Sequence, residues 1–487
     1  MKKTLLIWCF ILITINVFGQ QFSQYNTGSL YDSFENPAQR AFIPDTTRQY
    51  ASNFFIPNFS SDFYIAGNAQ QGVKTRLFSS YYNSANLKTG ENAFNRIRLN
   101  FNSYALMFKV FASENGDQEV GAFYNVKGDA RALATDETLA IFNGFNNFTG
   151  NSYSNVLNDN FRYQLYHQIG FTYREQVSKH FAFGLKLSAL SGIVYRETNI
   201  TQSSITFDRT AGTETAILSL EGESRTSAAD NKSNFQKYGP TFLNPGAAIS
   251  VGTMITDGLG YKWQINLKDL GFIYWNKASK TGVFGGTSTI EGFLGADRET
   301  AIKNGSTEIT TSNQTTGAFT TTTNGLLELS VNKQYWLDGN ERFKFSPTLI
   351  ASKELMYNGF TAALVAPVQM GKYTATVVSS YNDLKLFNLG AQFMYKANNS
   401  EFFIGTEQLF QSVSLARSAA NPPEKKQIAV SQGSHSGFGF YLGASFKFGY
   451  LIERRLNSSS IPDGDDGRGF FGRTWDKLFG KKDPGYN

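Results

Sequence analysis

The sequence has very little cysteine and histidine: one Cys and three His in 487 residues. The single thiol, Cys9, lies near the N-terminus, so the remainder of the chain cannot form a disulfide, a cysteine–zinc site or a lipid attachment. The histidines, His167, His180 and His435, have no serine partner or metal-ligand cluster at a supporting spacing. We therefore expect no enzyme, no cofactor and no metal.

Blocks of one charge and long hydrophobic runs are also missing. The net charge is +6 and no run of five like charges occurs, so we expect no nucleic acid partner. Beyond the N-terminus no apolar run reaches the ~18 residues of a transmembrane helix. Yet the chain has 44 Phe and 24 Tyr, interspersed with Gly, Ser, Thr and Asn. An aromatic-rich chain of this kind is either a soluble β-protein or a membrane barrel.

Residues 1–19 have the pattern of a secretory signal peptide. Lys2 and Lys3 precede an apolar run of about 13 residues and the small residue Gly19. The alternative is an N-terminal membrane anchor, but about 13 residues are too few for the ~20 that a spanning helix needs. We expect cleavage after Gly19 and export of the mature chain.

Several later segments alternate strictly between apolar and small or polar residues. In "GFGFYLGASFKFGYLIE", residues 437–453, every even position from 438 to 452 is apolar. "FAFGLKLSALSGIVYR", residues 181–196, repeats the pattern on odd positions. A period of two over 9 to 16 residues indicates strands longer than the ~5 to 6 residues usual in soluble sheets.

Counting these segments predicts about fourteen crossings of a transmembrane antiparallel β-barrel in residues 50–453. The expected crossings are 51–66, 97–111, 119–132, 160–174, 181–196, 241–255, 261–275, 325–337, 342–354, 358–367, 372–380, 384–396, 401–413 and 436–452. Short turns alternate with long polar loops at about 127–160, 197–240, 276–325 and 411–435. An even number of crossings places both ends of the barrel in the periplasm, with the long loops outside the cell.

A soluble β-sandwich or propeller would alternate in the same way. Its second face would be solvated, whereas here that face carries Gly and Ser as often as Lys or Glu, which suits a crowded lumen. Two segments, near 101–104 and 267–270, shift phase by one residue. Each shift indicates a β-bulge or a strand that leaves the bilayer at that point.

The inward-facing positions provide the candidate ligand residues. Four are basic, Lys109, Lys186, Arg196 and Lys447, and one is aromatic, Tyr441. The basic side chains would hold an anionic head group, and Tyr441 would lie along the body of a ligand.

The segment before the first crossing, residues 20–49, contains "FENPAQRAF" with Asn36, Pro37 and Ala38. An Asn-Pro-Ala box between a leader and a fourteen-stranded barrel resembles the FadL-type family of outer-membrane transport proteins. That family includes hydrocarbon and fatty-acid channels and PorV-type barrels that serve type 9 secretion. The resemblance implies that this segment folds into the lumen as a hatch. "YALMFKVFASENGD", "NLKDLGFIYW" and "EFFIGTEQLF" look closest to a group of such barrels with no assigned function.

Two features depart from the transport members: the basic inward positions and a long tail, residues 454–487. The tail contains a linker and then Phe471, Trp475, Leu478 and Phe479 at helical spacing. A short amphipathic helix there would plug the lumen, lie on the inner leaflet or bind a periplasmic partner; a frayed tail is the alternative.

Two functions from different classes remain open for a protein located in the outer membrane of a Gram-negative bacterium, surrounded by lipid. The first is passive transport of a hydrophobic or amphipathic small molecule. The second is a non-enzymatic platform for a secretion or cell-surface protein partner.

Overall fold

The computed structural model of the chain describes residues 22–73, 83–112, 118–210, 214–228, 239–293, 295, 297–420 and 436–452. The expected leader, 1–19, and the expected tail, 454–487, lie outside these residues.

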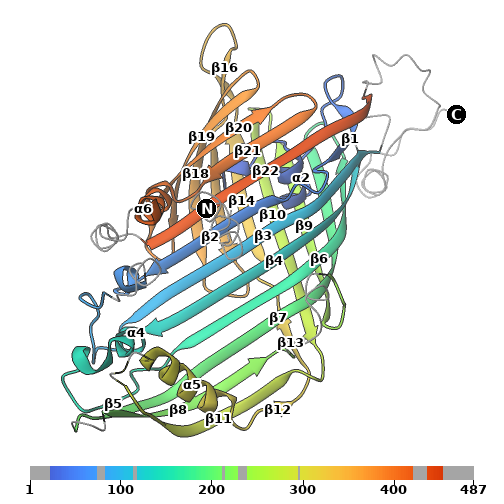
Figure 1. Ribbon diagram of the computed structural model, residues 1–487. Helices are drawn as coiled ribbons and strands as arrows, with labels where there is room; N and C mark the ends of the chain where they lie inside the picture. Colours follow the sequence, from blue (N-terminus) through green and yellow to red (C-terminus); the bar gives the residue numbers. More distant parts are fainter. Residues whose placement is uncertain are drawn as a thin grey trace, which may run out of the picture.

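The fold is an all-β, closed antiparallel barrel of fourteen crossings, as the sequence predicts (Figure 1). The first crossing consists of β1 (Arg48–Ser52) and β2 (Asn58–Ala66), and both halves pair with β22 on one side and β3 on the other. The cylinder therefore closes between its first and last crossings. The other thirteen crossings are β3 (Phe94–Phe111), β4 (Gln118–Thr135), β6 (Asn160–Gln176), β7 (Phe181–Asp208), β9 (Pro245–Thr256), β10 (Tyr261–Trp275), β14 (Leu326–Lys333), β17 (Thr348–Glu354), β18 (Phe360–Met370), β19 (Tyr373–Asn382), β20 (Phe387–Lys396), β21 (Ser400–Thr406) and β22 (Ser436–Leu451).

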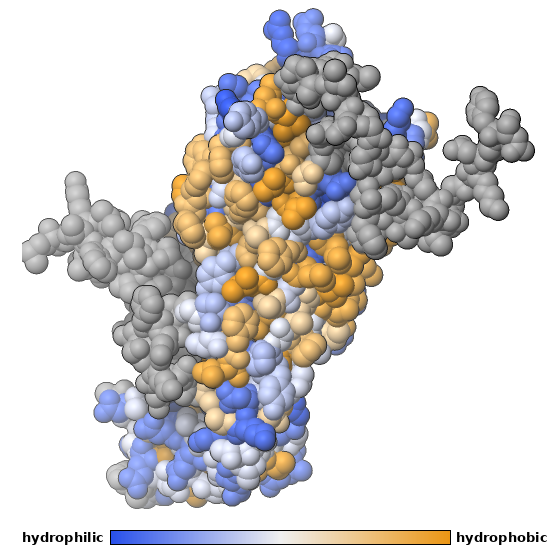
Figure 2. Space-filling model, turned by 90° about the vertical axis from the view of Figure 1, so that its right-hand side faces the viewer, coloured by the Kyte–Doolittle hydropathy of each residue, from blue (hydrophilic) through white to orange (hydrophobic). Residues whose placement is uncertain are grey.

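The outer face of the barrel carries a broad apolar belt. Phe171, Leu187 and Ile249 are exposed cross-strand neighbours on β6, β7 and β9. Figure 2 shows apolar side chains across the middle of one face, with polar side chains gathered at its lower end. A closed cylinder satisfies its backbone hydrogen bonds internally, and a belt of apolar side chains on it faces lipid. These are the properties of an outer-membrane β-barrel.

Among the described residues, no helix has the length and apolar character to cross a membrane.

At the end of the barrel that carries the long connections, which we expect to be extracellular, the sheet continues beyond the barrel wall. β7 extends to Asp208 and pairs there with β5 and β8, and β8 pairs in turn with β11. This extracellular extension consists of β5 (Ser152–Ser154), β8 (Thr215–Thr226), β11 (Lys280–Ile290), β12 (Thr315–Thr316), α4 (Asp136–Ala140), η2 (Ile141–Asn147) and α5 (Arg298–Thr311). It has a hydrophobic core of its own, which includes Ile205, Leu218, Phe284 and Ile309.

This extension corrects the expected loops. The stretches 197–240 and 276–325 contain strands, and β4 continues to Thr135 within the expected loop 127–160. The strand β8 buries Leu218 and Leu220 by alternation. Because many of its other residues are Ser, Thr and Glu, its sequence resembles that of a polar loop. The crossing expected at 401–413 ends at Thr406, because the helix α6 (Leu409–Ala420) begins three residues later.

Three shorter strands complete the elements. β13 (Phe319–Thr322) pairs with the extracellular end of β10, and β15 (Tyr335–Trp336) pairs with β16 (Phe343–Phe345), which also pairs with β18.

Both predicted phase shifts are β-bulges within strands. The register of β3 shifts between Tyr104 and Leu106, and that of β10 shifts between Leu267 and Leu270. Asp269 has a positive φ of 45°, which turns its side chain into the lumen. A third shift, opposite Leu165 and Tyr166, lies in β7 and was not predicted.

The side chain of Asn53 supplies hydrogen bonds at the interruption between β1 and β2. The amide of Asn53 donates to the carbonyls of Ile56, Tyr104 and Ala105 and accepts from the N–H of Met107. Asn53 is fully buried, so its side chain replaces hydrogen bonds that the interrupted strand does not make.

Replacing this side chain should destabilise the barrel. Asn53→Ala leaves several buried backbone groups without partners, and we expect a loss of about 2 to 4 kcal/mol in the free energy of unfolding. Urea unfolding in detergent micelles, followed by heat-modifiable electrophoresis, measures it. The control is Asn86→Ala, at an exposed position. Equal stability of the two variants would contradict the role of Asn53.

Candidate functional site

The N-terminal segment, residues 22–47, is buried inside the barrel against its wall, and it is called the hatch below. It contains η1 (Phe22–Gln24) and α2 (Leu30–Glu35). Ser29 caps α2 by accepting a hydrogen bond from the N–H of Asp32. α2 buries aromatic side chains against the wall, where the ring of Phe34 lies 5.7 Å from that of Phe123. The hatch and the wall therefore share an apolar core.

The Asn-Pro-Ala box fixes the middle of the hatch to the wall. The side-chain oxygen of Asn36 accepts from the N–H of Ala38, and Arg174 on β6 donates to the carbonyl of Ala38 at 2.9 Å. Pro37 passes so close to Gly184 that a β-carbon on Gly184 would lie 2.1 Å from the Pro37 carbonyl carbon. The box therefore requires glycine on the facing strand.

The three predicted lysines lie in the lumen, and each is paired with a carboxylate. The ammonium groups lie 3.2 Å from Glu119 for Lys109, 3.4 Å from Asp269 for Lys186 and 2.8 Å from Glu401 for Lys447. Two of these carboxylates hold the hatch: Glu119 accepts from the N–H of Ala41, and Glu401 accepts from the N–H of Leu30. Lys109 and Lys447 therefore orient groups that bind the hatch.

The other two predicted residues lie apart from one another. Tyr441 is buried in the core shared by the hatch and the wall. Arg196 follows the unpredicted bulge in β7, which reverses the two faces of the strand. Tyr195 is consequently buried in the lumen. The guanidinium of Arg196 lies over the ring of Phe161, and the cross-strand neighbour of Arg196 is the exposed Tyr163. The expectation that Arg196 faces the lumen is therefore wrong.

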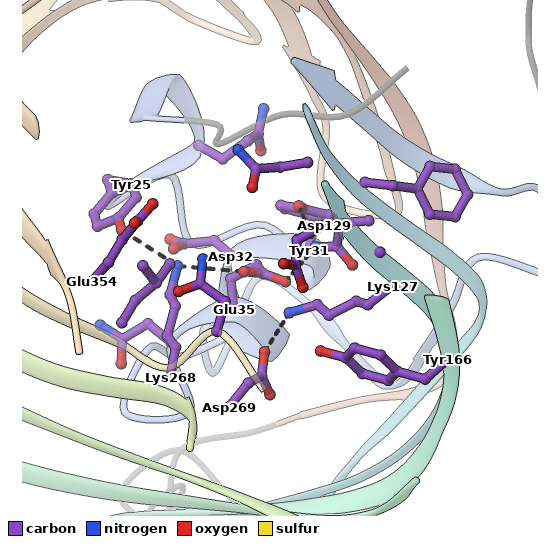
Figure 3. A pocket seen from close by; sticks show the side chains of 18 residues that line it. Tyr25, Tyr31, Asp32, Glu35, Lys127, Asp129, Tyr166, Lys268, Asp269 and Glu354 are labelled. Carbon is purple, nitrogen blue, oxygen red and sulfur yellow. Dashed lines mark hydrogen bonds and ion pairs between the residues drawn. The ribbon is translucent and has the colours of Figure 1, made fainter. Parts of the chain in front are cut away.

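The charged centre of the lumen joins the hatch to both walls. Glu35, at the end of α2, lies 3.3 Å from Lys268 on β10, and Lys268 lies 3.0 Å from Glu328 on β14. Lys127 on β4 pairs with Asp269 (Figure 3). Burial alone would raise the pKa of Glu35, but the charges of Lys127 and Lys268 lower it to about 2. Glu35 therefore remains ionised in the closed hatch.

A cavity of about 110 Å³ lies on the extracellular side of α2. Its walls combine rings with charged groups, as Figure 3 shows. It is lined by Gln24, Tyr25, Tyr31, Asp32, Glu35, Asn36, Asn100, Phe101, Asn102, Lys127, Gly128, Asp129, Tyr166, Lys268, Asp269, Asn324, Leu326 and Glu354. Such a lining can bind an amphipathic molecule by ring contacts and hydrogen bonds.

Sequence reasoning missed the acidic members of this site. Glu119 and Glu401 lie at inward positions of their strands, so their parity could have identified them. Asp269 could not be placed, because it occupies a bulge. Within the described ranges, no group of three His, Cys, Asp or Glu residues could hold a metal ion.

Comparisons with known proteins give one family and several barrels. Residues 41–407 match the model of a family of unknown function (DUF5723). No curated protein matches the chain.

The similar solved structures include FadL-type proteins, the group that the sequence resembles. The toluene transporter TbuX of Ralstonia pickettii is 9% identical, with a TM-score of 0.42 over 86% of this chain and 94% of that one. A FadL homologue from Pseudomonas aeruginosa is 11% identical, with a TM-score of 0.41 over 88% and 96%. The toluene transporter TodX of Pseudomonas putida is 10% identical, with a TM-score of 0.37 over 89% and 96%.

Closure of the hatch should depend on pH through Asp32. Burial raises the pKa of this carboxyl to about 7, although the N–H of Gly28 and the charge of Lys396 oppose the rise. Asp32 is neutral in the closed hatch below that pH, so closure loses stability as the pH rises from about 4 through 7. The loss is a few kcal/mol at most, since one pKa unit corresponds to about 1.4 kcal/mol.

Amide hydrogen exchange of residues 22–47, corrected for intrinsic rates, measures this loss between pH 5 and 8. Asp32→Asn should reduce the pH dependence; the remainder comes from Glu407, which accepts from the N–H of Ser23 in the hatch and whose pKa burial also raises to about 7. Glu35→Gln is the matched control. It should lower protection against exchange by the same amount at pH 5 and pH 8, because Glu35 is ionised throughout that range. A wild-type hatch with equal protection at pH 5 and 8 would show that Asp32 does not govern closure.

Proposed function

The chain belongs to the family of unknown function DUF5723, and from its plugged barrel we propose that it is a hatch-gated, non-enzymatic channel for passive transport of a small amphipathic molecule. The observation that carries the proposal is the cavity between the hatch and the extracellular end of the lumen. A solute from outside would reach this cavity before it reached the hatch. The mixture of tyrosine rings and charged groups favours an amphipathic molecule over a pure hydrocarbon.

The described state is the closed one. A cavity of about 110 Å³ is smaller than the ~300 to 1,000 Å³ of sites for drug-sized ligands, so passage requires the hatch to move. Many of its contacts with the wall are hydrogen bonds and ion pairs, such as those of Glu35, Leu30 and Ala41. Polar contacts of this kind can be exchanged for contacts with water or a ligand, which supports a movable plug.

A second candidate function is a platform for an extracellular protein partner. The extracellular extension favours it, because its hydrophobic core makes it a folded unit in place of mobile loops. Channels for small solutes do not require such a unit.

A cross-link between hatch and wall should close the channel. A β-carbon built on Gly252 of β9 would lie 3.2 Å from the β-carbon of Ala38, close to the ~3.5 to 4.5 Å of disulfides. The Asn36 amide has to rotate away from that position. Ala38→Cys/Gly252→Cys, oxidised, should lower solute flux into proteoliposomes at least tenfold, and dithiothreitol should restore it. The two single-cysteine variants are the controls.

Flux that is the same in the oxidised and reduced double variant would contradict transport past the hatch. The platform function makes a different prediction. Removal of residues 214–226 and 280–311 would abolish a stable surface complex while leaving solute flux unchanged; unchanged complex formation would count against the platform.

A further inference from the structure

We propose that three arginines at the extracellular end of the lumen, Arg98, Arg131 and Arg162, form a binding site for a small carboxylate or phosphate anion. These arginines, called the arginine row below, lie on adjacent strands. The site deepens the proposed transport function, because it would make the transported molecule an anion, and it rests on that function for its purpose.

The arginine row is unusual because its members are direct cross-strand neighbours. Arg98 on β3 is paired with Arg131 on β4, and Arg131 is paired with Arg162 on β6. Like charges directly opposite one another destabilise a sheet, so the row needs anions to offset the repulsion. All three side chains are largely buried, with 12% to 16% of their surface exposed. Solvent alone therefore does little to screen them.

In the closed state, the anions come mostly from the opposite wall. Arg98 holds both oxygens of Asp383, at 2.7 and 2.6 Å, and Arg131 holds both oxygens of Glu354, at 2.7 Å. Around the closed fourteen-stranded wall, Glu354 at the end of β17 lies six crossings from β4, and Asp383, which follows β19, lies five crossings from β3 by the shorter way. The two carboxylates thus show how a ligand carboxylate would lie in each guanidinium fork.

Between Glu354 and β18, the turn 355–359 covers the arginine row. The ring of Tyr357 lies 3.9 Å from the guanidinium carbon of Arg162 and 4.6 Å from that of Arg131. The carbonyl of Asn358 accepts from Arg98 at 2.8 Å. Since this turn and Glu354 belong to one hairpin, release of Glu354 would free the turn as well.

The row has donors that the closed state does not use. The Nε–H groups of Arg131 and Arg162 and the hydroxyl of Tyr357 are buried without a hydrogen-bond partner among the described residues. Buried donors without acceptors are costly, and a ligand with several oxygens would satisfy them. Asp129 and Glu354, which pair with the row, also line the cavity, so the site adjoins it (Figure 3).

These features select the ligand class. Planar guanidinium forks recognise carboxylate and phosphate by paired hydrogen bonds, whereas they repel cations and gain nothing from hydrocarbons. The arginine row faces the lumen, so the anion comes as a free solute from outside. It would replace Glu354 and Asp383, and the turn 355–359 would swing away from the lumen.

Binding is tested on the purified full chain in detergent, by isothermal titration at low ionic strength, where ion pairs are least screened. The probes are succinate and inorganic phosphate, with uncharged succinamide as the matched ligand control. We expect succinate or phosphate to bind and succinamide not to bind. Arg131→Gln/Arg162→Gln should weaken binding about tenfold or more. Arg225→Gln is the control variant, because Arg225 is 44% exposed and its nearest carboxylate is 4.0 Å away.

A second variant separates a binding site from a purely structural latch. Glu354→Gln/Asp383→Asn removes the competing carboxylates while preserving shape, and it should raise the affinity for succinate or phosphate several-fold. A structural latch predicts no such gain. Heat-modifiable electrophoresis confirms that each variant is folded.

Three results would overturn the proposal. In the first, neither anion binds to the wild type or to Glu354→Gln/Asp383→Asn. In the second, Arg131→Gln/Arg162→Gln binds the anions as tightly as the wild type does. In the third, succinamide binds as tightly as succinate. The assay needs no transport. Anion binding together with flux that the hatch cross-link leaves unchanged would retain the site and reject the channel.

Discussion

Every feature of this molecule depends on the need to satisfy backbone hydrogen bonds inside a bilayer. A sheet in lipid must close, and here it closes where β1 and β2 pair with β22. Where the first crossing is interrupted, the Asn53 side chain supplies the missing bonds. Closure in turn creates a lumen that has to be filled, and the hatch fills it with both rings and charges.

Many of the buried cationic side chains in the lumen form ion pairs with buried carboxylates of the same chain. Lys109 and Lys447 pair with carboxylates that hold the hatch, and Arg98 and Arg131 pair with carboxylates from the opposite wall. Breaking a buried ion pair leaves an uncompensated charge, whereas exchanging one partner for a ligand of the same charge does not. This difference is the physical basis of the proposed exchange of Glu354 and Asp383 for a solute anion.

Much of the fold follows from the sequence because a strand with one face in lipid has a strict period of two. That period predicts the fourteen crossings, the two phase shifts that the structure shows to be bulges in β3 and β10, and the inward lysines. It fails at Arg196, since a bulge that leaves no trace in hydrophobicity reverses the phase. It also fails for β8, whose polar composition resembles a loop, and for pairs such as Glu35 and Lys268, because periodicity contains no information about which side chains meet across a lumen.

The seam between β1 and β22 also has a kinetic consequence. It joins Arg48 to Leu451, ~400 residues apart along the chain, so closure has a large loop entropy to overcome and should be the last and slowest step of folding. Until then two long strand edges stand open to intermolecular pairing. The hatch immediately precedes β1 and is thus tethered at the seam. It is positioned to enter the interior while the cylinder is still an open sheet, with no need to thread through a finished pore.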